Sequence, residues 1–169
     1  MEMIGILKRQ AVIVLLFICF FPTMAVAQVG QFKLKQVLQD ANAGDISACA
    51  YLGKMYYDGI GVAQNYNEAL KWFQKAADNG VVGAYSDLAR MSYIGKGGIK
   101  DYSKAKNYAE LAIKNDTLDI VGHRILAKLY IHGYGVEKNI AKAEALIEQA
   151  LAHCKKDGSS DYPCNTMDA

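Results

Sequence analysis

The sequence predicts an all-α solenoid of stacked helical hairpins, and three observations support this prediction. Apolar residues recur at helical spacing through most of the chain. One pattern of small, aromatic and glycine residues returns roughly every 36 residues, which is typical of helical repeat proteins. Prolines, which break helices, number only 2 among 169 residues. With 52% hydrophobic and 21% charged residues, the composition is that of a globular domain rather than a disordered segment.

Residues 1–27 have the features of a secretory signal peptide and are set aside from the fold. Lys8 and Arg9 give a positive start, and an unbroken apolar run from Ala11 to Phe21 follows. This run is too short to span a bilayer comfortably, and Ala25-Val26-Ala27 offers the small residues that signal peptidase needs. We expect a mature bacterial protein, periplasmic or secreted, without a stable membrane anchor. An uncleaved anchor is the alternative.

The cysteines suggest a disulfide in the polar tail at residues 153–169. Export implies an oxidising compartment, in which disulfides persist. Cys154 and Cys164 flank a turn-forming stretch and are expected to pair. Closing so small a loop contributes about 2–3 kcal/mol when it is unstrained. Cys49 lies within a predicted helix and is expected to be a small buried apolar residue.

Three segments of the expected repeat domain, residues 28–152, share the repeated pattern. The units span about 48–80, 84–116 and 122–152, and a half unit at 31–44 precedes them. Each unit is predicted to form a helix, a glycine loop and a second helix. The first helix contains a leucine followed by a small residue, which allows close helix approach. These pairs are Leu52-Gly53, Leu88-Ala89 and Leu126-Ala127.

The loop of each unit contains two glycines and then a β-branched residue. The glycine pairs 59/61, 95/97 and 133/135 are expected to end the first helix. Val62, Ile99 and Val136 are expected to fill the gap between the two helices. The second helix is expected to begin after a capping residue, namely Asn65, Asp101 or Asn139. Asn65 and Glu68 have the spacing of a capping box.

These residues resemble the Sel1-like repeat, a relative of the tetratricopeptide repeat. Unit one carries the motif almost throughout, from Ala48 through Leu52-Gly53, Tyr56 and Val62 to Gly80. Unit two departs from it at Ala89 and Ser92, and unit three at Leu146 and Leu151. The resemblance implies a short right-handed α-solenoid whose first helices line a concave face that binds another protein. We expect the protein to be monomeric.

Residues at matching repeat positions on that face are the predicted partner contacts. Lys54, Arg90 and Lys128 would form a basic stripe, and an acidic segment of a protein partner would suit it. Aromatic and apolar side chains would flank the stripe, and tyrosine and arginine are common at binding hot spots. The neighbouring positions carry Tyr57, Asp58, Tyr93, Ile94, Ile131 and His132. The alternative is a solvated face whose aromatic residues pack on the neighbouring repeat.

The sequence gives little support for catalysis, cofactors or nucleic acid. His123 is expected to be a packed core residue, and no cysteine and histidine set has zinc spacing. Gly95 to Lys100 lacks the Gly-Lys-Ser/Thr of a phosphate loop. Ser103 to Lys106 matches Ser-x-x-Lys, but the Lys-Thr-Gly of penicillin-recognising enzymes is missing. A formal charge of +2 does not favour nucleic acid as a partner.

The leading functional hypothesis is therefore an exported adaptor that holds one protein partner and is not an enzyme. A narrower alternative is a periplasmic immunity protein or inhibitor that neutralises a secreted toxin. A host-directed factor acting after secretion is a further alternative. The alternative of another class is an enzyme that acts on a β-lactam or a cell-wall peptide.

Overall fold

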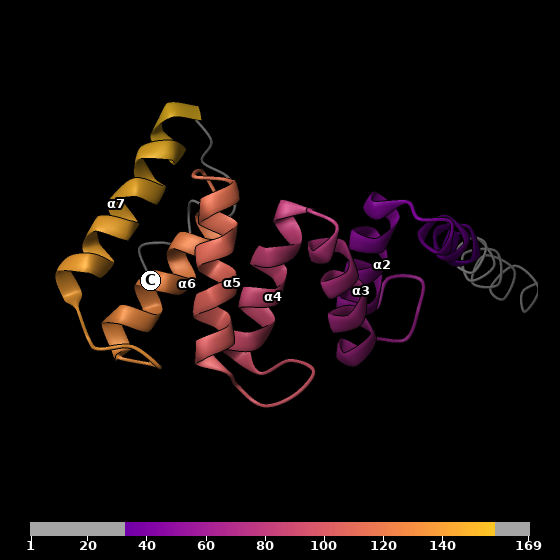
Figure 1. Cartoon of the computed structure of the whole chain (residues 1–169), viewed down its shortest axis with the longest axis horizontal. Helices are drawn as coiled ribbons and strands as arrows, with labels where there is room; N and C mark the ends of the chain where they lie inside the picture. Colours follow the sequence, from indigo (N-terminus) through magenta and orange to yellow (C-terminus); the bar gives the residue numbers. More distant parts are fainter. Residues whose placement is uncertain (1–32, 158–169) are drawn as a thin grey trace, which may run out of the picture.

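A computed structural model describes residues 33–157, with side chains placed for residues 33–152. Residues 33–42 form a helix, and six further helices follow it along the long axis of the molecule (Figure 1). Their bounds are α2 Ile46–Asp58, α3 Tyr66–Asp78, α4 Val82–Ile94, α5 Tyr102–Asn115, α6 Ile120–His132 and α7 Ile140–Asp157. Every regular element in this part of the chain is a helix, so the all-α prediction is confirmed.

The helices pair in chain order into three hairpins, which we call unit one (α2–α3), unit two (α4–α5) and unit three (α6–α7). Each helix from α2 to α6 contacts the next one along the chain. The first helices of units two and three, α4 and α6, also contact each other. We call α2, α4 and α6 the A helices, and α3, α5 and α7 the B helices. Figure 1 shows this stacking, in which α4 is visible between α3 and α5.

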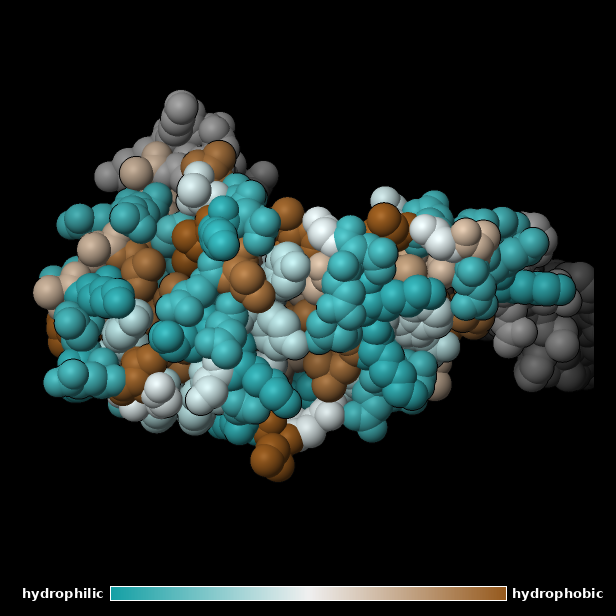
Figure 2. All heavy atoms as spheres, viewed as in Figure 1, coloured by the Kyte–Doolittle hydropathy of each residue, from teal (hydrophilic) through white to brown (hydrophobic). Residues whose placement is uncertain are grey.

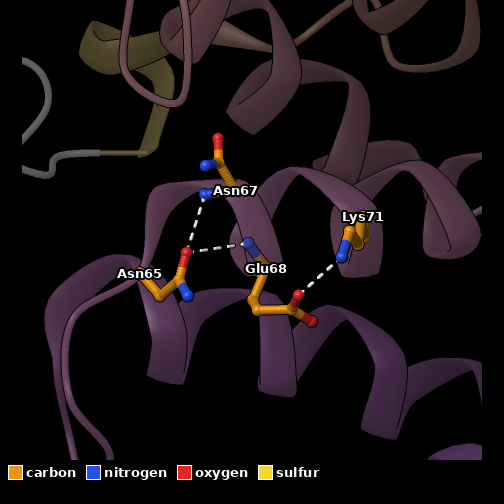
Figure 3. A network of polar contacts seen from close by, with 4 residues as sticks. All are labelled: Asn65, Asn67, Glu68 and Lys71. Atoms are coloured by element: carbon orange, nitrogen blue, oxygen red, sulfur yellow. Dashed lines mark hydrogen bonds and ion pairs between the residues drawn. The ribbon is translucent and has the colours of Figure 1, made fainter.

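The second helix of unit one begins at its expected cap. Asn65 Oδ1 accepts hydrogen bonds from Asn67 N at 3.1 Å and from Glu68 N at 3.2 Å (Figure 3). The Glu68 carboxylate pairs instead with Lys71 Nζ at 2.6 Å, and Asn65 N donates to the Tyr56 carbonyl. The predicted reciprocal capping box is therefore wrong in its second half, because the loop backbone already satisfies the Asn65 amide.

The caps of the other two B helices agree with the sequence prediction. Asp101 accepts from Lys104 N at 2.9 Å, and Asn139 accepts from Lys142 N at 2.9 Å. Each A helix ends at a glycine in the left-handed conformation, as at Gly59 with φ of 73°. A side chain at such a position would be strained, so the loops depend on glycine there.

The core combines large apolar side chains with small residues that let the two helices of a hairpin approach closely. In unit one, an added Cβ at Gly53 would lie 2.7 Å from the Phe73 ring, which is itself 1% exposed. Leu52 and Cys49 are buried in the same cluster, and Cys49 is a free thiol. Ala41 of the helix at residues 33–42 is fully buried there too, so this helix covers the start of the stack.

The expected role of Ile99 is wrong. Val62 and Val136 are half-buried against core clusters, whereas Ile99 is 91% exposed. The three loops have the same length, so their positions can be matched by counting from the first glycine rather than by residue type. Counted from the first glycine of each loop, Gly98 occupies the position of Val62 and Val136, and Ile99 lies one residue further on.

Two sequence predictions fall outside the described side chains. The signal peptide at residues 1–27 is one, and the pair Cys154 and Cys164 is the other. Within residues 33–157, no helix has both the length and the apolar character needed to cross a bilayer.

Candidate protein-binding face

The A helices carry a row of exposed side chains, which we call the A-helix face. In α2, Tyr51, Lys54 and Asp58 follow one another at helical spacing, and all three are exposed. Repeat-equivalent positions on α4 and α6 carry Ile94, Lys128 and His132, which are exposed as well. Tyr51 was not predicted as a contact, whereas Ile94 is one of the predicted neighbours of the stripe. Both are large apolar residues with high exposure, 39% for Tyr51 and 38% for Ile94.

Tyr57 does not belong to this exposed row, because the next unit covers it. Tyr57 is only 9% exposed. The Arg90 guanidinium carbon lies 4.7 Å from the ring centroid of Tyr57, and Lys96 Nζ lies 4.4 Å from it. Lys96 Nζ also donates to Tyr57 Oη at 3.1 Å. Tyr57 therefore joins units one and two, which agrees with the alternative that the aromatic positions pack between repeats.

Arg90 is half-buried and paired, so it adds less free positive charge to the face than expected. Its Nη2 lies 2.6 Å from Asp87 Oδ1, one turn earlier on α4. Burial raises the pKa of Asp87 above its ordinary value of 3.8, although the charge of Arg90 and its hydrogen bond act in the opposite direction. Because the carboxylate is largely desolvated, the pair is better described as part of the junction with Tyr57 than as an open contact.

Tyr93 occupies the equivalent junction between units two and three. Its ring lies edge-on to Tyr102 with centroids 5.8 Å apart, and Tyr102 stacks on Tyr134 at 4.6 Å. Tyr134 in turn stacks on His132 at 5.1 Å. Burial raises the pKa of Tyr93, and the neighbouring tyrosines add to this shift. Of this aromatic row, His132 and Tyr134 are exposed.

The predicted contacts therefore divide into two groups. Lys54, Asp58, Lys128 and His132 are exposed on the A-helix face. Tyr57, Arg90 and Tyr93 are buried or half-buried at the junctions between units, and Ile131 is half-buried against the core of unit three. The unpaired basic charge of the predicted stripe is thus concentrated in Lys54 and Lys128, at the two ends of the row.

The side chains that the sequence analysis weighed as catalytic or metal-binding candidates pack in the core, form ion pairs or lie exposed to solvent. His123 is 3% exposed, and its Nδ1 lies 2.8 Å from the Asp119 carbonyl oxygen, so the packed histidine is confirmed. Lys106 of the Ser-x-x-Lys string pairs with Glu110 at 3.2 Å, while Ser103 is exposed. Within the described part of the chain, no three His, Cys, Asp or Glu side chains are grouped so that they could hold a metal ion.

The fold and this face define an α-solenoid of short helical hairpins with a polar and aromatic ridge on its A helices. The model of the Sel1 repeat matches residues 46–81, 82–116 and 121–153, which is more than half of the chain. The chain therefore belongs to the Sel1 repeat family. Proteins of this family generally mediate protein–protein interactions and are typically non-catalytic.

Two solved structures are similar to the chain. A Sel1 repeat protein from Oxalobacter formigenes has 27% identity and a TM-score of 0.66, with 73% of this chain and 50% of that one covered. A protective antigen present in uropathogenic Escherichia coli strains has 23% identity and a TM-score of 0.62, with 78% of this chain and 32% of that one covered. The chain thus spans at most half the length of these two relatives. No curated protein matches it significantly.

Proposed function

We propose that this chain is an exported adaptor that holds a protein partner on its A-helix face. The observation that carries the proposal is the exposed row on the A helices of a fold that generally binds proteins, in which one acidic residue, Asp58, accompanies Tyr51, Lys54, Ile94, Lys128 and His132. Large apolar side chains beside separate cations offer both buried area and electrostatic selectivity. A partner with an acidic segment containing apolar residues complements such a surface.

Export is the second part of the proposal, and it rests on the sequence of residues 1–27. Cell fractionation of a tagged full-length chain tests it, with the tagged protein expected in the periplasm or medium at the mass of residues 28–169. Retention in the cytoplasm at full mass would contradict it. The proposed pair between Cys154 and Cys164 would make the non-reduced mature protein lighter than the reduced one by the mass of two hydrogen atoms.

A pull-down with residues 28–169 from periplasmic extract, followed by mass spectrometry, tests partner binding. One stoichiometric protein is the expected result, and its identity separates an endogenous adaptor target from a toxin held by an immunity protein. Capture should weaken strongly in the double variant Lys54→Glu/Lys128→Glu. Arg90 is left intact, because its pairing with Asp87 makes a charge reversal there a test of folding rather than binding.

A further inference from the structure

A groove lies between α3 and α5, on the side of the molecule opposite the A-helix face. It has a volume of about 790 Å³, and its floor is formed by Leu88 and Met91 of α4. Leu70 and Tyr108 form apolar parts of its two walls. Figure 2 looks onto this side and shows hydrophilic ridges over α3 and α5, paler atoms between them, and an apolar projection at the α4–α5 loop.

The groove exists because unit two has two small residues where its sister units have large ones. Ser92 lies at the position of Tyr56 and Tyr130, and Gly98 at that of Val62 and Val136. The register is fixed by a shared backbone hydrogen bond, which runs from Asp101 N to the Ser92 carbonyl in unit two. The same bond joins the equivalent residues in units one and three. Both Ser92 and Gly98 line the groove.

Gly98 is not required by the backbone. Its φ is not in the left-handed region, and an added Cβ would meet nothing within 4 Å. Gly97 beside it is different, because its Cβ would lie 2.6 Å from Leu70 and its φ is 85°. The missing side chain at Gly98 therefore leaves usable open space rather than relieving a clash.

Unit three shows what a filled version of this space contains. Tyr130 is 8% exposed there, and Lys142 Nζ lies 4.5 Å from its ring centroid. The repeat equivalent of Lys142 is Lys104, which lines the groove of unit two. Lys104 is 68% exposed and has a carboxylate, that of Asp101, at 3.6 Å. Unit two thus has a lysine, Lys104, at the position of Lys142, but it has Ser92 in place of the Tyr130 ring.

The rim of the groove favours an acidic occupant. Four lysines and two aspartates line it, namely Lys71, Lys75, Lys96, Lys104, Asp78 and Asp101. Beside them, Ile99 offers a nearly fully exposed apolar side chain at the mouth. An aromatic ring entering between these groups would gain burial against Leu70 and a cation–π contact with Lys104.

We propose that this groove binds a tyrosine side chain carried by an acidic segment of a second protein. The ring takes the place that Tyr130 holds in unit three, under Lys104 Nζ, and the acidic neighbours of the tyrosine face the lysine rim. This site is separate from the A-helix face, so the chain would hold partner segments on two opposite sides.

The test uses the mature protein, an acetylated peptide with one tyrosine between pairs of acidic residues, and a matched peptide with alanine in its place. The tyrosine peptide should produce saturable NMR shifts at the amides of Gly97, Gly98 and Lys104, and the alanine peptide should not. Ser92→Tyr/Gly98→Val should raise the melting temperature and abolish these shifts, whereas Ser92→Ala should retain them. Lys104→Met should weaken binding about tenfold, the size of a strong cation–π contact.

Several results would overturn the proposal. These are no saturable shift with the tyrosine peptide, equal shifts with both peptides, or undiminished shifts in the filled variant. Shifts confined to α2, α4 and α6 would also reject the groove while supporting the A-helix face. If the double variant fails to fold, Gly98→Val alone gives the same readout. The polar tail at residues 153–169 contains a tyrosine of its own, Tyr162. If Tyr162→Ala shifts the Gly98 amide signal in the absence of any peptide, the occupant is the chain's own tail and the proposal of a second protein is rejected.

Discussion

Lys96 Nζ lies 4.4 Å from the ring centroid of Tyr57 and 4.7 Å from that of Tyr66, so a loop of unit two contacts both helices of unit one. Tyr134 occupies the equivalent loop position in unit three, and it stacks on Tyr102 of unit two. The same loop position therefore connects successive units, through the Lys96 cation between units one and two and through the Tyr134 ring between units two and three.

Removal of the Lys96 side chain should loosen the joint between units one and two. We expect Lys96→Ala to lower the free energy of unfolding by about 0.5–1 kcal/mol, because the contact is a partly exposed cation–π interaction. Urea unfolding measures the change. Lys100→Ala, an exposed lysine in the same loop, is the control and should have almost no effect. Equal effects of the two variants would contradict a specific role for Lys96.

Gly53 and Gly83 form a matched pair for testing helix approach. Gly53→Ala should destabilise by about 1–3 kcal/mol, because the new Cβ would lie 2.7 Å from the buried Phe73 ring. Gly83→Ala should be neutral or stabilise by about 0.5 kcal/mol, since its Cβ meets nothing within 4 Å and alanine favours a helix. Thermal melts of the two variants give the comparison. A harmless Gly53→Ala would mean that the α2–α3 contact is looser than the structure has it.

Asp119, the N-cap of α6, connects units two and three. Its carboxylate accepts from Gly122 N at 2.6 Å and from Ser86 Oγ at 2.8 Å, and Ser86 is 6% exposed. Asp119→Ala should cost about 2 kcal/mol, more than the loss of an exposed cap, because a buried hydroxyl also loses its acceptor. In the Ser86→Ala background the cost should be smaller. Additive effects in this double-mutant cycle would show that the two side chains are not coupled.

Asp87 should give the protein an unusual pH dependence. Its pKa is raised above the unfolded value of 3.8, so the folded state binds its proton more tightly than the unfolded state. The contribution of Asp87 to stability is then greatest below the unfolded pKa and falls as pH rises through the folded pKa. Arg90, Lys54 and Asp58 are the charges that act on it.

The measurement is the free energy of unfolding of the protein minus that of the Asp87→Asn variant, taken between about pH 3 and about pH 6. This difference should fall with rising pH. A difference that grows with pH would show that pairing with Arg90 outweighs the burial of the carboxylate.

Periodicity was sufficient to predict the fold, because each hairpin repeats the same spacing of leucine, small residue and loop glycine. It also identified the caps at Asn65, Asp101 and Asn139, since capping depends on residues close in sequence. Ile99 was misplaced because matching by residue type shifted the register by one, whereas counting from the loop glycine assigns that position to Gly98. A local sequence pattern indicates which residue types belong in the loop. The structure is needed to show which residue occupies the space between the two helices.

The candidate face was predicted only in part for a related physical reason. Repeat position alone places Tyr57 and Arg90 beside Lys54. Their exposure, however, depends on Lys96 and Asp87, which come from the next loop and from the preceding turn of the same helix. Comparison of the three units position by position would have revealed Ser92 and Gly98 as the small residues of unit two. That difference is the one sequence signal of the groove.

Site-specific photo-crosslinking in cells that make the protein tests the central claim most directly. A photoreactive phenylalanine analogue would replace Lys54 or Lys128 on the A-helix face, and Lys114 on α5 as the control, all three being exposed. The account predicts an adduct with the same protein from positions 54 and 128, and none from position 114. An adduct only from position 114, or the same yield at all three positions, would contradict binding on the A-helix face.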